Sequence, residues 1–399
     1  MDALTTPSNW QRVRLGDICE FGNGGAYETL IVENGDFKLI SLNSIDIDGN
    51  LKNTMKRVNF YDNSLKQDDI VMVLSDVAHG DFLGLCAVIP NNDYVLNQRM
   101  GRLRKKNDCI NILFLRLYIN ANQKYFKMQG QGSSQLNLSK KAIEDFEIPL
   151  PPLNEQAAIA NILSALNHYL YSLDALILKK ESVKKALSFE LLSQRKRLKG
   201  FNQAWQRVRL GDIAEIKRGA SPRPIENPKW FCANSNVGWV RISDISKNSR
   251  FLYKTAQKLS KKGIEKSRFV KQNSLIMSMC ATIGKPIITK IDTCIHDGFV
   301  VFENPKIDLN YLYYFLCYIE KEWLESGQQG SQVNLNVDLI KNKEVFCPKD
   351  LNEQIAIANI LSGLDSEIIS LKNKKRQFEN VKKALNHDLM SAKIRVLKK

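Results

Sequence analysis

Two long stretches of the chain carry apolar residues at steps of mostly three and four positions. In the first stretch they are Ile159, Ile162, Leu166, Leu170, Leu173, Ile177, Val183, Leu187 and Leu191. In the second they are Ile357, Ile360, Leu364, Ile368, Leu371, Phe378, Val381, Leu385 and Leu389. This spacing is typical of a coiled-coil seam, so we predict two long helices packed side by side and antiparallel. Roughly 45 helical residues at ~1.5 Å each give a rod of about 65–70 Å, with Asn154 as the first N-cap.

Between these stretches the apolar runs are short and separated by Gly, Asn, Asp and Lys clusters. Runs at 39–45 and 69–75 have counterparts at 239–245 and 274–280. Such runs are typical of strands in a mixed α/β domain with long loops. Longer apolar stretches at 110–125 and 309–324 predict one central helix in each domain.

The chain contains an internal repeat. Residues 10–18 return, identical at all nine positions, as 205–213, and residues 154–166 return as 352–364 with two differences. We therefore predict an α+β fold with a pseudo-twofold repeat and four parts. A first variable domain (1–150) precedes a first long-helix region (151–200). A second variable domain (201–348) precedes a second long-helix region (349–399).

Composition narrows the class of partner. The 399 residues carry 58 Lys and Arg against 42 Asp and Glu, a net charge of +16. An excess of positive charge favours a polyanionic partner. No apolar run reaches the ~18 residues of a membrane helix, and the N-terminus lacks a signal-peptide pattern. The eight cysteines form no CxxC motif. We therefore expect a cytoplasmic protein with reduced thiols and no membrane partner.

Two related domains joined by rods suit double-stranded DNA, whose dyad symmetry offers two half-sites. Because the domains have diverged while the helices have not, each domain is expected to read a different half of a split, asymmetric target. The conserved helices would offer equivalent docking surfaces to two copies of a partner. A two-headed protein adaptor without DNA affinity fits the same architecture.

The residues at these positions resemble a known family, the specificity subunits of type I restriction–modification systems. The resemblance rests on the Trp-x-x-Val-x-Leu-Gly-Asp-Ile openings, on Pro-Leu-Pro-Pro-Leu-Asn-Glu-Gln at 149–156 followed by Ala-Ile-Ala-Asn-Ile-Leu, and on Val95–Arg104. The chain departs from the pattern at 346–351, where the double proline is missing.

The resemblance implies two target-recognition domains and a DNA-binding subunit without catalytic activity. It implies assembly with two methyltransferase subunits, and with two restriction subunits in the full nuclease. S-adenosylmethionine, ATP and Mg are then expected on those partner subunits, and no cofactor on this chain.

Motifs for chemistry in the chain itself are weak. Residues 227–230 imitate a methyltransferase loop but lack its second proline, and the glycines at 21–25 have no counterpart in the second half. No phosphate-binding P-loop occurs, and the four histidines are far apart, so no metal site and no catalytic residue are predicted. A self-contained adenine methyltransferase remains the enzymatic alternative.

Polar and basic loop residues are the candidates for DNA contact, because bases and phosphates are read by such groups. In the first domain they are Ser75, His79, Asn97, Gln98, Arg99, Arg102, Arg104, Lys105, Gln131, Ser133, Ser134 and Gln135. In the second they are Arg218, Arg223, Ser278, Thr282, Lys285, His296, Gln328, Gln329, Ser331 and Gln332.

Candidates for partner binding lie at the start of each long helix. They are Asn154, Glu155, Gln156, Asn352, Glu353 and Gln354. Packing of the two helices on each other would not by itself require identical polar residues here, so we expect an exposed docking surface.

Overall fold

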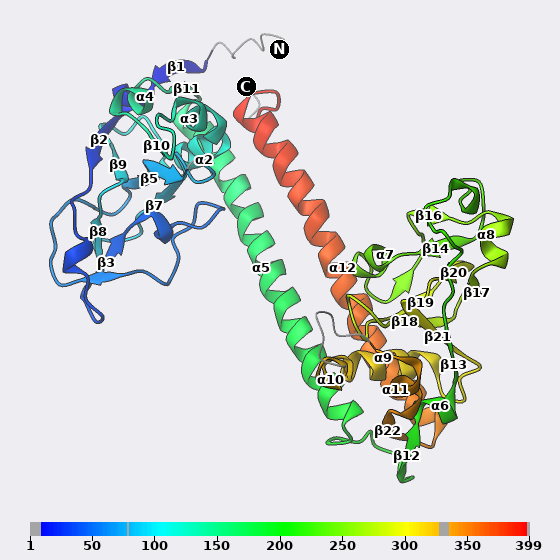
Figure 1. Cartoon of the computed structure of the whole chain (residues 1–399). Helices are drawn as coiled ribbons and strands as arrows, with labels where there is room; N and C mark the ends of the chain where they lie inside the picture. Colours follow the sequence, from blue (N-terminus) through cyan, green and yellow to red (C-terminus); the bar gives the residue numbers. More distant parts are fainter. Residues whose placement is uncertain (1–8, 78–79, 327–334, 397–399) are drawn as a thin grey trace. The chain divides into compact units, whose positions relative to one another are not determined.

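The computed structural model describes residues 9–77, 80–326 and 335–396, which form two compact units (Figure 1). The first unit contains residues 1–174 and 374–399, and the second contains 175–373. Each unit thus takes one variable domain together with part of both long helices. The sequence-based division into four parts cuts the chain where a domain meets its helix, whereas the compact units divide each helix near its middle.

The first domain is a mixed α/β structure. Its strands are β1 (Gln11–Arg14), β2 (Cys19–Asn23), β3 (Phe37–Ile40), β4 (Arg57–Val58), β5 (Ile70–Val73), β6 (Ser75–Val77), β7 (Cys86–Val88), β8 (Tyr94–Leu96), β9 (Met100–Lys105), β10 (Gln135–Asn137) and β11 (Glu147–Leu150). Its short helices are α1 (Leu15–Ile18), η1 (Glu28–Leu30), η2 (Leu42–Ser44), α2 (Ile112–Ala121), α3 (Gln123–Gln129) and α4 (Lys140–Glu144).

Strand β5 lies at the centre of this domain, in a sheet of order β2-β9-β5-β7. Ile70 and Met72 face the core under α2, while Val71 and Val73 face a second core shared with β8. A strand buried on both faces reads as a continuous apolar run, which is why this strand was predictable from the sequence. A second sheet has the order β4-β3-β8, and two-stranded pairs join β1 to β11 and β6 to β10.

The second domain repeats this plan with additions. Its strands are β12 (Trp205–Arg209), β13 (Glu215–Arg218), β14 (Gly238–Val240), β15 (Phe251–Leu252), β16 (Gln257–Lys258), β17 (Arg268–Val270), β18 (Leu275–Ser278), β19 (Pro286–Thr289), β20 (Thr293–Ile295), β21 (Phe299–Glu303) and β22 (Glu344–Pro348). Its short helices are α6 (Leu210–Ile213), η3 (Pro228–Trp230), α7 (Ile242–Ser246), α8 (Lys261–Glu265), α9 (Leu309–Tyr318), α10 (Glu320–Ser326) and α11 (Val337–Asn342).

The sheets confirm the predicted repeat. The second domain has the order β13-β21-β18-β19-β15 where the first has β2-β9-β5-β7, and β16-β14-β20-β17 where the first has β4-β3-β8. The central helices differ from the prediction in one respect, because each is broken in two. Asn122 separates α2 from α3, and Ile319 separates α9 from α10.

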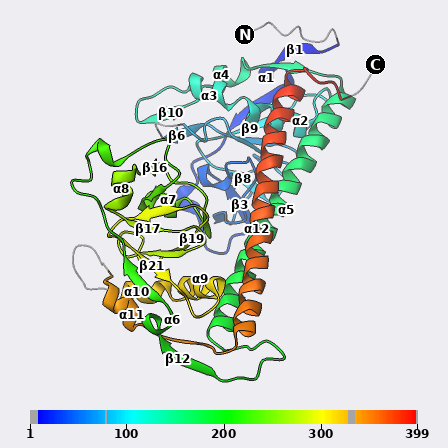
Figure 2. The ribbon, with the colours of Figure 1, turned by 90° about the vertical axis from the view of Figure 1, so that its right-hand side faces the viewer.

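The long helices α5 (Leu153–Leu192) and α12 (Leu351–Met390) have 40 residues each, or about 60 Å, slightly less than predicted. In the first unit they run antiparallel, with the Tyr169 and Phe378 rings 4.7 Å apart and Lys375 paired with Asp174 (Figure 2). In the second unit Lys180 pairs with Glu367 and Lys184 with Asp365, so the helices are again antiparallel. The predicted packing of α5 on α12 is confirmed within each unit.

The start of α5 corrects one detail of the prediction. Asn154 is not the N-cap, because α5 begins one residue earlier at Leu153, directly after Pro152. Each long helix is followed by a residue with positive φ, Gln194 (61°) after α5 and Ala392 (58°) after α12. These two residues lie 198 positions apart, which is the offset of the repeat. Such left-handed residues are common helix stops.

The seam is also shifted by one residue in the third turn of each helix. Ile162 and Ile360, predicted to lie in the seam, are 39% and 37% exposed, whereas their neighbours Leu163 and Leu361 are buried. The identical sequence Asn-Ile-Leu-Ser at both places offers two adjacent apolar residues. Spacing alone did not distinguish which of the two turns inward.

The predicted docking surface at the helix starts is wrong for its two glutamates, which are buried. Glu155 accepts hydrogen bonds from Trp10 Nε1 at 3.2 Å and from Arg395 Nε and Nη2 at 2.6 and 2.8 Å. In the second unit Glu353 holds Trp205 Nε1 at 3.2 Å and Arg197 Nη2 at 2.9 Å. These carboxylates therefore link the opening strand of a domain, the start of one helix and the tail of the other.

The glutamines beside them are buried as well, a second correction. Gln156 Oε1 accepts from the backbone of Asn111 at 2.8 Å, and its Nε2 donates to the carbonyl of Pro151 at 2.8 Å. Gln354 bonds in the same way to the backbone of Asp308 and to the carbonyl of Pro348. Each glutamine ties a long helix to the start of a central helix, so the identity across the repeat has an internal cause. Asn154 and Asn352 are exposed, and their docking role stays a prediction.

Candidate nucleic-acid interface

A cleft of about 430 Å³ in the first domain brings together candidates from three separate segments. Ser75 lies on β6, Arg99 in the turn between β8 and β9, and Ser134 and Gln135 at the start of β10. Strands β6 and β10 position them, because Gln135 pairs with Val77 and Asn137 with Ser75 in an antiparallel register. The cleft thus combines a guanidinium, an amide and hydroxyls within one concave surface.

The cleft also contains residues that the sequence reading missed. Asn43 and Lys52 line it, both from the stretch around η2. Asn43 lies within the run 39–45 that was predicted as a strand, so nothing in the pattern marked it as a loop residue. Ser75, by contrast, is buried and donates its hydroxyl to Asn137 Oδ1 at 2.5 Å.

Asn97 and Gln98 have protein partners. Asn97 is buried, its Nδ2 donates to Glu28 Oε1 at 2.9 Å, and its Oδ1 accepts from the Tyr27 backbone at 3.1 Å. Gln98 donates to the other oxygen of Glu28 at 2.7 Å. The bond from Gln98, with that from Asn97, lowers the pKa of Glu28. Both amides thereby hold the turn at η1. Burial corrects the predicted DNA contact of Asn97, whereas that of partly exposed Gln98 stays a prediction.

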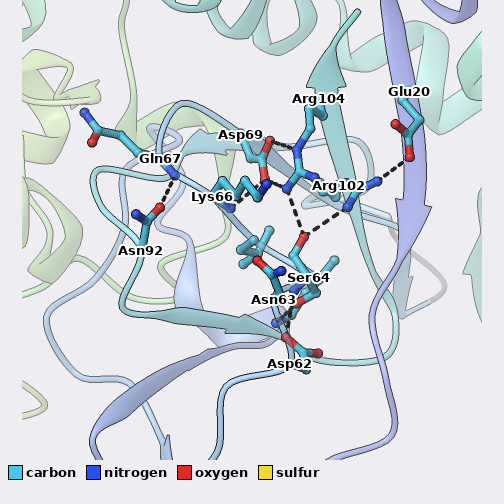
Figure 3. Close-up of polar contacts among 12 residues, drawn as sticks. Glu20, Asp62, Asn63, Ser64, Lys66, Gln67, Asp69, Asn92, Arg102 and Arg104 are labelled. Carbon is cyan, nitrogen blue, oxygen red and sulfur yellow. Dashed lines mark hydrogen bonds and ion pairs between the residues drawn. The ribbon is translucent and has the colours of Figure 1, made fainter.

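The basic residues of β9 are engaged within the domain (Figure 3). Arg104 forms a bidentate ion pair with buried Asp69 at 2.8 and 2.6 Å, and this bond raises the pKa of Arg104. Arg102 donates to Glu20 at 2.6 Å and to the carbonyl of Ser64 at 3.1 Å. Both guanidiniums thus take part in the domain's own ion pairs, and their DNA contacts stay predictions. Lys105 pairs with exposed Asp108 at 2.6 Å, and its DNA contact stays a prediction.

The loop before β10 is open to solvent. Gln131, Ser133 and Ser134 are exposed, and the loop is closed by backbone hydrogen bonds between Gln131 and Asn137. Its counterparts Gln328, Gln329, Ser331 and Gln332 lie outside the described residues, as does His79. Contact of this loop with DNA stays a prediction.

In the second domain two predicted arginines converge on Asp297. Arg218 Nε donates to the backbone carbonyl of Asp297 at 2.9 Å, and Arg223 reaches its carboxylate at 3.3 Å. Partial burial opposes ionisation of Asp297, but the hydrogen bond from Ser221 and the nearby Arg223 lower its pKa. Both arginines are exposed, so this cluster presents two guanidiniums to solvent.

His296 lies behind this cluster. Its Nδ1 accepts from the Gly298 backbone at 3.0 Å, and its ring packs against Trp239 and Phe299. Burial, together with Arg241, lowers the pKa of His296 against the opposing effect of Asp297. The ring is therefore a partly exposed aromatic support for the turn.

The loop after β18 is closed by a hydrogen bond between two of its own residues. Ser278 is fully buried, and its hydroxyl donates to the carbonyl of Thr282. This corrects Ser278 as a DNA contact, because its side chain closes the loop. Lys285 is partly exposed, and Thr282 Oγ1 is buried without a hydrogen-bond partner within the described residues. Their DNA contacts stay predictions.

The two domains place different side chains on one shared backbone turn. The Leu74 backbone donates to the carbonyl of Arg99, and the Met279 backbone donates to that of Gly298. A glycine lies against the first residue of the turn in both domains. Gly24 lies against the carbonyl of Asn97, and Gly219 lies against the carbonyl of His296. The turn therefore reads Asn-Gln-Arg in one domain and His-Asp-Gly in the other, on the same scaffold.

Within residues 9–77, 80–326 and 335–396, no group of three or more His, Cys, Asp or Glu side chains is placed to hold a metal ion. Over the same ranges, no helix is both long and apolar enough to cross a bilayer.

The repeated fold matches known proteins. The family described as "Type I restriction modification DNA specificity domain" matches twice, over residues 7–180 and 202–380. The chain belongs to this family. Each match contains one variable domain and most of the long helix after it, so the chain is a specificity subunit of the type I restriction–modification kind, with two DNA specificity domains.

Relatives agree over the whole length. The type I restriction enzyme MjaVIII specificity subunit of Methanocaldococcus jannaschii is 26% identical over 423 residues, covering 99% of this chain and 95% of the relative. A crystal structure of a type I S subunit from M. genitalium has a TM-score of 0.65 at 16% identity and covers 97% of both chains. A structure concerned with complex assembly and conformational transition of the type I system has a TM-score of 0.60 at 16% identity, with 97% and 98% covered.

Proposed function

We propose that this specificity subunit directs a methyltransferase and restriction complex to an asymmetric, bipartite DNA target, with one half-site read by each domain. The observation that carries the proposal is a shared backbone turn that carries Arg99 in the first domain and Asp297, with Arg218 and Arg223 around it, in the second. A common scaffold would place both domains on duplex DNA alike, while different side chains would select different bases.

The first domain is proposed to read bases through its cleft. An arginine donates two hydrogen bonds to guanine, and a glutamine pairs with adenine by donating from its amide nitrogen and accepting at its amide oxygen. Arg99 and Gln135 supply these two groups within the same cleft, and Lys52 adds a positive charge suited to phosphate. In the second domain Arg218 and Arg223 are the corresponding donors, held by Asp297.

The long helices are proposed to dock two methyltransferase subunits. Exposed apolar residues recur on α5 and α12 at the repeat offset of 198 positions. They are Leu153 and Leu351, Ile162 and Ile360, Tyr171 and Ile369, and Val183 and Val381. Apolar side chains left exposed in a repeated pattern favour a partner that binds twice. Two restriction subunits would join the same complex.

The chain itself is proposed to be non-catalytic. S-adenosylmethionine, ATP and Mg would then bind the partner subunits, and the complex would work on chromosomal DNA in the cytoplasm. The recognition residues described above are hydrogen-bond donors, acceptors and cations, which suits base reading and phosphate contact.

Crosslinking on the complex with its methyltransferase partner tests this proposal. Radiolabelled S-adenosylmethionine is expected to label the partner alone, and the complex is expected to bind duplex DNA with an affinity that falls steeply with salt. Label on this chain would support a self-contained methyltransferase instead. Absence of DNA affinity at low salt would support a protein adaptor.

A further inference from the structure

The positive charge of the two domains is unequal. Residues 1–150 carry 17 Lys and Arg against 18 Asp and Glu, whereas residues 201–348 carry 22 against 14. Much of the difference lies in one stretch, residues 259–274 between β16 and β18, which has five basic residues and one acidic one. The corresponding stretch of the first domain, 59–69 between β4 and β5, has one lysine and three aspartates.

This stretch forms structure that the first domain lacks. It contains α8 and β17, and β17 adds an edge strand to β20, whereas no helix or strand occurs between β4 and β5. Lys261, Lys262, Lys266 and Lys271 are exposed, and none of them forms an ion pair within the described part of the chain. Ordered lysines without acidic partners favour a polyanion, because binding releases the counterions on both sides.

The basic stretch lies beside the proposed base-reading cluster of the second domain. Strand β17 pairs with β20 up to Ile295, the residue directly before His296. Arg268 Nε on β17 donates to the carbonyl of Arg218 at 3.1 Å. Across the other side of α8, the Ser260 hydroxyl donates to the carbonyl of Lys229, whose side chain is also exposed. A duplex on the Arg218–Asp297 cluster would therefore bring its flanking phosphates toward these lysines.

We propose that α8 and β17 form a phosphate-binding surface for the DNA backbone flanking the second half-site. The second domain then supplies most of the salt-dependent affinity, and the neutral first domain contributes mainly base selection. The proposal rests on the DNA-reading function proposed above, and it specifies how the two domains divide the work.

A charge-neutralised variant tests this inference. In the full chain with its methyltransferase partner, Lys261, Lys262, Lys266 and Lys271 are all changed to Gln. Binding to a fluorescent duplex of random sequence is measured over a salt series. Each lost phosphate contact reduces the slope of log K against log salt by ~0.9, so we expect a reduction of about 2 to 4.

Two control variants distinguish the effect of this surface from the effect of the protein's total charge. Changing exposed Lys56, Lys66, Lys124 and Lys141 of the first domain to Gln removes the same charge and is expected to leave the slope nearly unchanged. Changing the four second-domain lysines to Arg is expected to retain the slope, and thermal unfolding shows that each variant is folded.

The outcomes distinguish the two proposals. Equal loss of slope in both Gln variants, or no loss in the second-domain variant, would overturn the phosphate surface while leaving DNA reading intact. A wild-type complex without salt-dependent DNA affinity would instead overturn the DNA-reading function, and the surface with it.

Discussion

At the scale of single residues, the buried glutamates Glu155 and Glu353 each join three parts of their unit. Each accepts hydrogen bonds from the tryptophan that opens its domain and from an arginine that follows the other long helix. The arginine side chains are about 30% exposed, while the carboxylates are almost fully buried. A buried carboxylate that loses its cation leaves hydrogen-bonding groups unsatisfied, which is costly.

Replacing Glu155 by Gln tests this contribution. The amide can still accept from Trp10 but cannot pair with Arg395, so we expect the free energy of unfolding to fall by about 1–3 kcal/mol. Glu147→Gln breaks the exposed pair with Arg12 and is expected to cost below about 1 kcal/mol. Urea unfolding of both variants measures the difference. Equal costs would contradict the role assigned to Glu155.

The pH dependence of the second domain depends on His296. Burial lowers the pKa of His296 below its ordinary value near 6.5, so the unfolded state binds the proton more readily than the folded state. Stability contributed by the neutral ring is therefore present above about pH 6.5 and lost as the pH falls below it.

The variant His296→Asn introduces the residue that the first domain has at this place. We expect the melting temperature of the wild type to fall between pH 7 and 5.5 more than that of the variant, as scanning calorimetry measures. His387→Asn, on the exposed face of α12, controls for loss of a histidine. A variant that loses stability with pH as steeply as the wild type would contradict this account.

Arg99 and Arg104 are equal candidates in the sequence but have different surroundings in the structure, a cleft for Arg99 and an ion pair with Asp69 for Arg104. Arg99→Ala is expected to weaken binding to the target about 10–100-fold and to relax selection at one base pair, with unchanged stability. Arg104→Ala leaves buried Asp69 without its cation and is expected to lower stability by about 2 kcal/mol. Competition binding and thermal unfolding on both variants separate these effects. Relaxed selection with Arg104→Ala, at wild-type stability, would reverse the assignment.

Residue roles were the least predictable level. The polar or basic residues on strands or directly after them include Asn97, Arg102, Arg104 and Ser278, and a DNA-reading residue would have the same character and place. Whether such a side chain reaches DNA or closes its own loop depends on a distant partner, such as Glu28 for Asn97. That partner is 69 positions away in the chain, and no local pattern indicates it.

At the scale of elements, periodicity succeeded for the long helices because a seam of about 40 residues averages over many positions. It was wrong by one residue at Ile162 and Ile360, where two apolar residues are adjacent. It also missed the breaks at Asn122 and Ile319, because apolar spacing continues through them. Strands buried on both faces, such as β5, were found from their continuous apolar runs.

Substitutions at adjacent buried and exposed residues of the long helices distinguish helix packing from the docking of a partner. Leu163→Ala and Leu361→Ala remove buried side chains and are each expected to cost about 2–4 kcal/mol of stability. Ile162→Arg and Ile360→Arg, at exposed positions, are each expected to leave stability nearly unchanged and to remove one of two methyltransferase subunits. Light scattering on the purified complexes measures the number of subunits. Two bound subunits in both arginine variants would argue against this docking surface.

At the scale of the whole molecule, the repeat is fully visible in the sequence. The two copies of the opening motif and of the helix starts predict the order of parts, and the specificity-domain family matches both halves of the chain in that order. The grouping of each domain with parts of both helices was not visible. It depends on contacts such as Arg395 with Glu155, 240 positions apart, which only the folded chain reveals.

A methylation map of the genome tests the central claim that each domain reads one half of a split target. N6-methyladenine is mapped in cells with the wild-type chain and in cells where residues 201–348 are replaced by the same domain of a relative. We expect one asymmetric split motif in the wild type, and in the exchange a motif that keeps one half and changes the other. A motif that stays whole, or that changes in both halves, would contradict the account.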